Sequence, residues 1–555
     1  MFVKKSWCVR KGKKYTTYQI AESYRPGKNK NPRTRILATI THLPLPLIEQ
    51  ISLLLKSPQA QVVSDLSPFF KSSFILGPIL FFSLFMERMG IGEALSLIPS
   101  KSRTLLWAVI LNRILDPRSK LGSVAWVKRT AFSFLGGIEK ETLTVNEIYQ
   151  AMDALYERME EVFDQFGKKN QKQTTLLLYD LTSIFFEGKG CEGLAQYGYS
   201  RDHREENPQI LLSLCLNEKK LPVYFEVLAG NLQDKKTVIP FIQKLKERFH
   251  LTQAIFIGDR GMITAENLQC LEKENLDYIV ALTHREAREL IFSKNIQPEL
   301  FDERIPVTIY EDNEEEMRKK KYVLCGSQYR KEHDLALFHL LLQKGRASLE
   351  KVKKMVEEGR LKDPVKVIRR AERHLTLSGA EKFYHFRYED GTFEIIEKTT
   401  HIDKAQALCG YYVLKTTASD LKDEEVERHY KGLKWVEDSF RELKDLVEVR
   451  PIFHWKERRV KTHVFLCILA QTVINQARET LKQSGWLDER KENSFSSFLD
   501  LLYQINLGIF EIEKVETKVI TPLTQEEKKI LKIFQMEEKY FTHFDKAKER
   551  FCSVV

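Results

Sequence analysis

The spacing of hydrophobic residues changes along the chain, from a helical period to short strand-like runs near residue 174. Upstream, 105–115 and 145–166 carry apolar residues three and four positions apart, which predicts amphipathic helices. The most apolar stretch, 74–86, is 13 residues long. A transmembrane helix needs about 20 residues, so we expect a buried helix there and no membrane span.

Downstream of residue 174, short apolar runs predict a sheet. Strands are expected at 175–186, 209–216, 222–228, 254–258 and 278–282, with amphipathic helices at 237–249 and 264–274. The order is three strands, a helix, a strand, a helix and a strand. Antiparallel strands followed by strand-helix units are typical of a mixed α/β sheet whose parallel strands are buried under helices.

The regular alternation of predicted strands and helices stops between residues 284 and 423. Short strands are expected at 306–310 and 322–325 and a hairpin at Asp390-Gly391, around a basic helical stretch at 348–374. Helical patterns resume at 424–446 and 460–481. We therefore expect a separate inserted domain that contains β-structure, leaves after the fifth strand and returns at the helix 424–446.

Positive charge is concentrated at the start of the chain. The sequence has 88 Lys and Arg against 77 Asp and Glu, a net charge of +11, and the first 35 residues contribute +10 of it. Such an arm is typical of a protein that binds a polyanion, because neutralised phosphates release counterions. The alternative interpretation is that the charges of this terminus are only solvated and bind no partner. Strand patterns at 15–24 and 35–40 flank a Pro26-Gly27 turn, so we expect the arm to be β-structured.

Cysteine usage and the N-terminus indicate a compartment. The eight cysteines include no Cys-x-x-Cys pair, and no apolar signal core follows the first lysines. Neither a zinc knuckle nor a disulfide framework is predicted. We expect a protein of the reduced cytoplasm.

Two aspartates stand at strand positions in similar settings, each beside a buried apolar run. Asp180 follows Leu-Leu-Leu-Tyr, and Asp259 follows Ile-Phe-Ile-Gly. An ionised carboxylate beside an apolar sheet is costly unless it is paired or bound to a cation, so two such groups indicate a shared ligand. An aspartate that forms a turn or caps a helix is the structural alternative.

A third acid lies on the helix 424–446. Tyr430, Glu437 and Lys444 are spaced at intervals of seven, which places them on one side of a helix. Arg441 lies one turn from Glu437, so an exposed ion pair between these two is the alternative.

Four sequence blocks resemble the DDE transposases of bacterial insertion sequences, and the best fit is to the insertion-sequence-4-like family, particularly its 1634-type members. The blocks are YDLTSIFFEG, GYSRDHREENPQILLSL, FIGDRGMITAENL and HYKGLKWVEDSFRELKDLVEVRPIFHWKERRVKTHVFLCILA. The resemblance covers residues 15–470. It implies a ribonuclease H-like α/β fold with a mixed sheet, a helical N-terminal region and a β-containing insertion.

The resemblance also implies a set of site residues. Asp180, Asp259 and Glu437 match the catalytic acids, which bind two Mg²⁺ ions, with Mn²⁺ able to substitute. Such ions prefer carboxylate and water ligands. The family signature, Tyr, two residues, Arg, three residues, Glu, six residues, Lys, is met by Tyr430, Glu437 and Lys444, whereas Leu433 takes the place of the arginine. The DNA-binding residues implied are Tyr430, Lys444 and Arg441, with Lys434 as a substitute for the missing arginine and Trp435 as a base-stacking or core residue.

Downstream of the signature, basic and aromatic residues alternate between Arg450 and His463. This pattern suits backbone tracking and base stacking on DNA, and a solvated helix start is the alternative.

The function implied is cut-and-paste transposition by a dimer acting on the inverted ends of its own element in a bacterial, nucleoid-associated setting. A structure-selective nuclease and a catalytically silent DNA-binding descendant are the alternatives. The expected domains are a basic arm at 1–45, a helical domain at 46–170, a catalytic domain at 171–283 and 424–481, an insertion at 284–423, and a C-terminal region without assigned role at 482–555.

Overall fold

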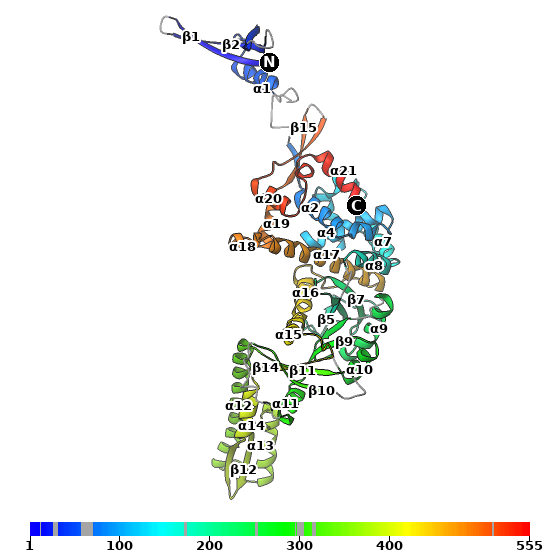
Figure 1. Cartoon of the computed structure of the whole chain (residues 1–555), viewed down its shortest axis with the longest axis vertical. Helices are drawn as coiled ribbons and strands as arrows, with labels where there is room; N and C mark the ends of the chain where they lie inside the picture. Colours follow the sequence, from blue (N-terminus) through cyan, green and yellow to red (C-terminus); the bar gives the residue numbers. More distant parts are fainter. Residues whose placement is uncertain are drawn as a thin grey trace.

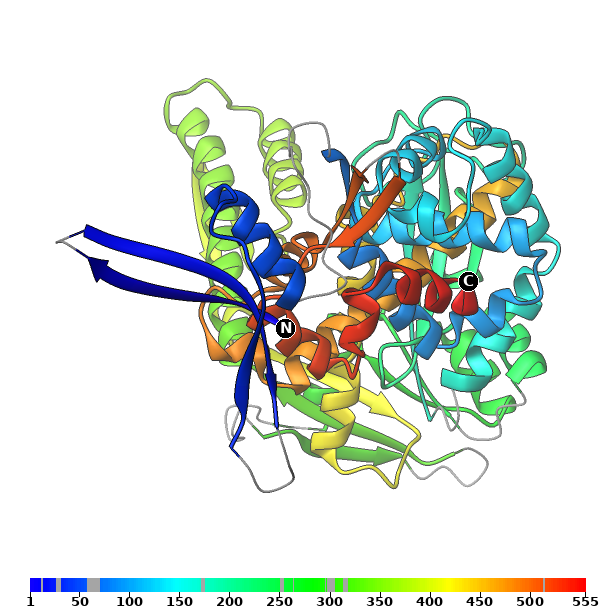
Figure 2. The same ribbon diagram turned by 90° about the horizontal axis from the view of Figure 1, so that it is seen from above.

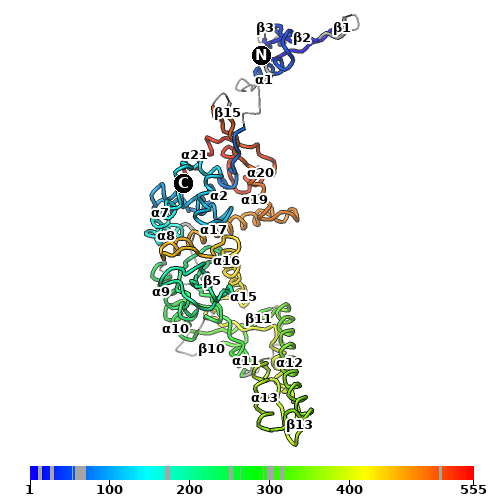
Figure 3. The backbone as a smooth tube through the Cα atoms, turned by 180° about the vertical axis from the view of Figure 1, so that it is seen from behind, coloured from blue at the N-terminus to red at the C-terminus, as the bar shows by residue number. Residues whose placement is uncertain are grey.

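The computed structural model describes residues 1–10, 13–25, 31–56, 70–170, 175–249, 254–262, 264–294, 296, 305–312, 318–512 and 515–555. Figure 1 shows an elongated molecule with the N-terminal strands at one end, a large sheet near the middle and strand β12 at the other end. The tube in Figure 3 shows the same order from behind. The regions that the sequence separates therefore follow one another along the long axis.

The basic arm folds into a three-stranded antiparallel sheet. Its strands are β1 (Phe2–Arg10), β2 (Lys13–Tyr24) and β3 (Arg33–Thr39), and the helix α1 (Leu45–Lys56) packs against β1. The strands expected at 15–24 and 35–40 are confirmed, and the Pro26-Gly27 turn lies outside the described residues. Strand β1 was not predicted. Because α1 packs on this sheet, the first unit reaches at least Lys56 and does not end at residue 45.

The next region is helical. It begins with the strand β4 (Phe70–Ile75) and continues through α2 (Gly77–Arg88), α3 (Ile91–Leu95), α4 (Ser100–Leu115), α5 (Lys120–Arg129), α6 (Phe132–Leu135), α7 (Val145–Tyr156) and α8 (Met159–Asn170). The apolar stretch 74–86 is thus only partly helix, because Phe74 belongs to β4. The helical pattern at 145–166 divides into α7 and α8 at Glu157 and Arg158. Among the described residues, no helix is both long and apolar enough to cross a membrane.

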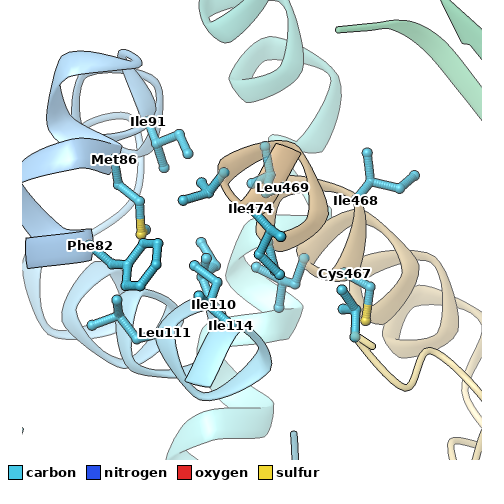
Figure 4. Close-up of a cluster of buried hydrophobic side chains, with 14 of the residues drawn as sticks. Phe82, Met86, Ile91, Ile110, Leu111, Ile114, Cys467, Ile468, Leu469 and Ile474 are labelled. Carbon is cyan, nitrogen blue, oxygen red and sulfur yellow. The ribbon is translucent and has the colours of Figure 1, made fainter. Parts of the chain in front are cut away.

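The core of this region joins helices from distant parts of the chain. Figure 4 shows Phe82 and Met86 of α2 and Ile110 of α4 facing Leu469 and Ile474 of the long helix α17 (Glu457–Gln483). The buried Trp107 indole N–H donates to Ser83 Oγ at 3.1 Å, so the one polar atom of this large side chain is satisfied. The core of the helical region is therefore completed by a helix that lies far downstream in the sequence.

The C-terminal region also returns to the helical region. It contains α18 (Trp486–Glu489), α19 (Phe495–Tyr503), β15 (Asn506–Ile512), β16 (Val515–Ile520), α20 (Gln525–Ile533), the 3-10 turn η3 (Glu538–Phe541) and α21 (Phe544–Val554). Strand β15 pairs with β4, with Asn506 opposite Ile75, and α21 lies beside α2 (Figure 2). A Cβ on Gly77 would lie 2.2 Å from the carbonyl oxygen of Leu502, so only glycine permits this approach.

The large sheet has the strand order that the sequence predicts. Its first five strands in sequence are β5 (Leu176–Phe185), β6 (Gln209–Leu216), β7 (Pro222–Ala229), β8 (Ile255–Gly258) and β9 (Asp277–Ala281). In space they run β7-β6-β5-β8-β9, with β5, β6 and β7 antiparallel and β8 and β9 parallel to β5. This is the ribonuclease H-like arrangement. Each expected strand agrees with the structure to within two residues.

Helices cover both faces of this sheet, as alternation along β5 requires. Leu177, Tyr179 and Leu181 pack with α9 (Val238–Phe249) and α10 (Ala265–Lys273), while Leu176 and Leu178 belong to the core shared with α16 (Leu433–Asp445). The short 3-10 turn η1 (Asp234–Lys236) leads into α9. Asp180 therefore lies on the α16 face of β5.

The acidic helix expected at 424–446 is interrupted once. It consists of α15 (Asp423–Lys431) and α16, separated by Gly432. A Cβ at Gly432 would lie 2.9 Å from the carbonyl oxygen of His429 and 3.4 Å from the Leu178 side chain. Glycine thus allows the junction of α15 and α16 to lie close to strand β5.

The insertion has two parts, which corrects the expectation of a separate domain. After α11 (His284–Ser293), the strands β10 (Val307–Asp312), β11 (Lys320–Gly326) and β14 (Tyr411–Thr416) extend the large sheet beyond β9. Between β11 and β14, α12 (Gln328–Glu357), α13 (Pro364–Ser378), the hairpin β12 (Tyr384–Glu389) and β13 (Thr392–Glu397), and α14 (Thr399–Ala407) form a projection with its own apolar core. We call these elements the projection.

Candidate active site

The register of the central strands brings two aspartates together. In the parallel pair of β5 and β8, Tyr179 lies opposite Gly258. Asp180 and Asp259 are the next residues on these two chains, and neighbouring strands are about 4.8 Å apart. Glu437 lies on α16, which packs on β5. All three carboxylates line one cavity of about 450 Å³, together with Lys444, Arg441 and other polar residues.

The three acids influence one another electrostatically. The pKa of Asp180 is raised to about 7, chiefly by burial and further by Asp259 and Glu437, although the backbone N–H of Leu181 donates to its Oδ1 at 2.7 Å. Burial, Asp259 and Asp438 also raise the pKa of Glu437. A cation among these groups would relieve this repulsion, so the donor set suits a hard divalent metal ion.

The carboxylates do not yet form a closed coordination set. Among the described residues, no group of three or more His, Cys, Asp or Glu side chains is arranged as a ready-made metal site. Asp259 Oδ1 accepts from the backbone N–H of Arg260 at 2.8 Å. The three acids share the cavity, and their side chains would have to turn to meet at one ion.

The cavity also contains basic side chains, but these pair with other acids. The pairs are Lys444 with Asp202 at 2.9 Å, Arg450 with Asp202 at 2.9 Å and with Asp445 at 3.0 Å, Arg201 with Asp234 at 2.5 Å, and Arg441 with Asp438 at 2.6 Å. Within the described part of the chain, Asp180, Asp259 and Glu437 form no ion pair with Lys or Arg. The expected alternative pair of Arg441 with Glu437 is therefore wrong.

Asp202 is the centre of this arrangement. Its side chain is 4% exposed, and its Oδ1 binds both Lys444 and Arg450. Its Oδ2 is buried and has no hydrogen-bond partner in the described part of the chain. The loop between β5 and β6 that carries Asp202 is tied down by the backbone N–H of Arg201, which donates to Ser183 Oγ of β5 at 2.8 Å.

Sequence reasoning missed Asp202, Arg201 and Asp234. For Arg201 and Asp202 the available signal was the polar block GYSRDHREEN, which stands between two apolar strands, whereas Asp234 lies outside this block.

The signature residues of the acidic helix occupy different environments. Glu437 and Lys444 line the cavity, whereas Tyr430 packs its ring against Tyr412, with centroids 6.2 Å apart. Burial raises the pKa of Tyr430 to about 12, and Asp259 contributes to this shift. Leu433, at the place of the family arginine, is buried in the core. The side of the helix that faces the cavity therefore includes two of the three spaced residues.

Lys434 and Trp435 lie on other sides of the helix. Lys434 is exposed, and its charge lowers the pKa of Glu437 against the larger opposing effects. Trp435 is half-buried against the core, with Lys220 Nζ 5.3 Å from its ring centroid. This environment agrees with the core alternative for the tryptophan.

The basic and aromatic segment after α16 is mostly engaged within the protein. Arg458 and Arg459 pair with Asp153 at 3.0 and 2.8 Å, and Lys461 pairs with Glu457 at 2.6 Å. The aromatic side chains of Phe453 and Trp455 are 66% and 76% exposed. The segment thus presents exposed aromatic surface, while three of its cations, at the start of α17, pair with acids.

Comparison with known proteins assigns the family. The transposase DDE domain family matches residues 171–473, and the chain belongs to this family. Residues 3–64 match the N-terminal domain of IS1634 family transposases. The chain is thus a DNA transposase, an enzyme that cleaves and transfers DNA strands.

More distant likenesses are found among solved structures. The piggyBac transposase synaptic complex with hairpin DNA has a TM-score of 0.36 at 9% identity, over 78% of this chain and 82% of that chain. The Mos1 transposase paired-end complex with a left transposon end has a TM-score of 0.15 at 11% identity, over 42% of this chain and 67% of that chain. No curated protein matches the chain.

Proposed function

We propose that the protein cleaves DNA at the inverted ends of its insertion sequence and joins the freed ends to a target, with Asp180, Asp259 and Glu437 as metal-binding catalytic residues. The observation that supports this most is the register of β5 and β8. It brings Asp180 in the middle of β5 beside Asp259 at the end of β8, under the helix of Glu437 and in a cavity where other acids pair with the cations.

The three carboxylates would hold the metal ions that act on the reacting phosphate. When bound, two Mg²⁺ ions activate an oxygen nucleophile, stabilise the leaving oxygen and neutralise phosphate charge. Asp180, Asp259 and Glu437 would hold these ions, and no side chain acts as the nucleophile. In cleavage, water would attack the phosphorus and the P–O3′ bond would break, which frees the 3′-OH; in strand transfer, that 3′-OH would attack a target phosphate, whose own P–O3′ bond would break.

Basic residues of the cavity and its rim would bind the DNA backbone. Lys444 and Arg441 line the cavity and each pairs with a single aspartate, so a phosphate can approach the same charges. Lys434 and Tyr430 would contact the strand beside the cut, and the exposed edge of Trp435 would contact a base. A dimer bound to two transposon ends in the bacterial cytoplasm is the assembly that this function requires.

Replacement of Glu437 by glutamine tests the proposal. We expect Glu437→Gln to abolish Mg²⁺-dependent nicking of a duplex that carries one terminal repeat, because an amide is a poor ligand for a hard cation. Glu424→Gln, an exposed acid in the first turn of α15, is the matched control and should nick normally. Equal activity of both variants would refute the assignment. Nicking without strand-transfer product would favour a nuclease.

The basic N-terminal sheet predicts salt-dependent DNA binding. Lys4, Lys5 and Arg33 are exposed on its strands. Their combined replacement by glutamine should reduce the slope of log K against log salt by about 2.7, since each phosphate contact contributes about 0.9. Binding titrations on end-containing duplex, from low to physiological salt, measure this slope. An unchanged slope would show that the sheet does not touch DNA.

A further inference from the structure

The helix α13 of the projection has two chemically different faces. Val367, Ala371 and Leu375 are buried against α12 and the β12–β13 hairpin. The opposite face carries four exposed cations, which are Lys366, Arg369, Arg370 and Arg373. We call these four residues the α13 stripe. At 1.5 Å per residue, the stripe runs for about 10 Å along the helix.

The α13 stripe has one exposed acid beside it on the helix, Glu372, which forms no ion pair with it in the described part of the chain. Within the described residues, none of its four side chains forms an ion pair. The neighbouring cations Arg346, Lys353, Lys354 and Arg360 all pair with glutamates of the projection. Residues three and four apart on a helix are neighbours, so the stripe contains four adjacent like-charge pairs, each unfavourable by about 0.2–0.5 kcal/mol. A purely structural helix gains nothing from this arrangement.

The pKa of His374 is shifted by the same positive charges. Its pKa is lowered by burial and then by Arg370, Lys351 and Arg373. Lys351 lies on α12, so the positive potential spans both long helices of the projection.

The projection that carries the stripe is joined to the large sheet through paired strands and lies far from the N-terminal sheet. The strands β11 and β14, which flank the projection in sequence, pair with each other, and β14 pairs with β9. Figures 1 and 3 show α13 near one end of the long axis and β1 at the other, with the catalytic sheet between them. A second basic surface is thus presented on the far side of the active site.

We propose that the α13 stripe binds the phosphate backbone of duplex DNA without regard to sequence, away from the point of cleavage. This inference rests on the proposed function, since it takes DNA as the substrate. Ten ångströms of duplex axis carry about six phosphate charges, which is enough to face all four cations. Exposed basic side chains without base-reading partners position a protein on DNA and carry no sequence information.

Charge-matched variants test the proposal in the full-length protein. The stripe variant replaces Lys366, Arg369, Arg370 and Arg373 by glutamine, and the control replaces the paired Arg346, Lys353, Lys354 and Arg360 by glutamine. We expect the stripe variant to reduce the slope of log K against log salt by up to about 3.6 on duplex DNA, and the control to change it by less than about 1. Thermal unfolding should show the stripe variant at least as stable as the wild type.

The outcomes separate this proposal from the function on which it rests. Equal slopes for the wild type and the stripe variant, or equal losses in both variants, would overturn it. If the stripe variant binds DNA normally but loses binding to polyglutamate, the surface takes an acidic protein and the proposal is also wrong. Failure of wild-type protein to nick end-containing DNA at low salt would instead refute the proposed function, while the slopes would still decide whether α13 binds DNA.

Discussion

Asp180→Asn protein is expected to bind transposon-end DNA almost normally but to have lost strand cleavage by at least about a thousandfold. A metal ion contributes several kcal/mol to stabilising the charge of the transition state, and 1.36 kcal/mol is a factor of ten in rate. The phosphate contacts are carried by other residues, such as Lys444 and Arg441. Gel-shift and nicking assays on one end fragment measure the two effects, and equal loss of both would point to a folding defect.

The same substitution has a second, independent readout in metal-free buffer. Burial and the neighbouring carboxylates raise the pKa of Asp180 from 3.8 to about 7 in the folded chain. Between these values the folded state binds more protons at this carboxyl than the unfolded state, so the free energy of unfolding falls as pH rises. Asparagine does not titrate. Thermal unfolding should therefore show the variant more stable than the wild type at pH 8, with the difference vanishing near pH 4.

The second large effect is expected at Asp202. With Asp202→Asn, Lys444 and Arg450 lose their shared counter-charge and can turn toward Asp180 and Glu437 in the same cavity. The cations would then compete with the metal ion. We expect calorimetric Mn²⁺ affinity to fall by about 10–100-fold, as is typical when groups around a metal site are removed.

A double variant distinguishes this competition from simple unfolding. Breaking a buried ion pair by removing one partner costs about 3–5 kcal/mol, so Asp202→Asn will also lower stability. Asp202→Asn with Lys444→Met removes both charges and should recover part of the metal affinity, although DNA binding weakens. Stability recovered without metal affinity would mean that Asp202 acts only in folding.

The catalytic sheet was predictable because its sequence signals are local. Strands such as Leu176–Phe185 are short apolar runs bounded by polar residues, and the two aspartates directly follow the hydrophobic parts of neighbouring strands. Such strands can be recognised from the local sequence alone, without knowledge of their tertiary contacts. The family resemblance then connected these acids with Glu437, which lies 178 residues after Asp259.

Other features depend on contacts that no local pattern contains. The need for glycine at position 432 follows from the closeness of Leu178, which belongs to another element. Asp202 looks like any acid of a polar loop, and only the fold brings it to Lys444. The segment with β10, β11 and β14 was predicted as a separate domain, because no local pattern shows that β14 pairs with the edge of β9.

The pairing of β4 with β15 determines when the protein can finish folding. Ile75 leaves the ribosome well before its partner Asn506, which lies 431 residues further along the chain. At about 5 to 20 residues per second, the intervening synthesis takes on the order of 20 to 90 seconds. During that time the edge of β4 and the apolar surface of α2 lack their C-terminal cover. A nascent chain, or one that ends before β15, would therefore expose an apolar surface and an unpaired strand edge to chaperones and proteases.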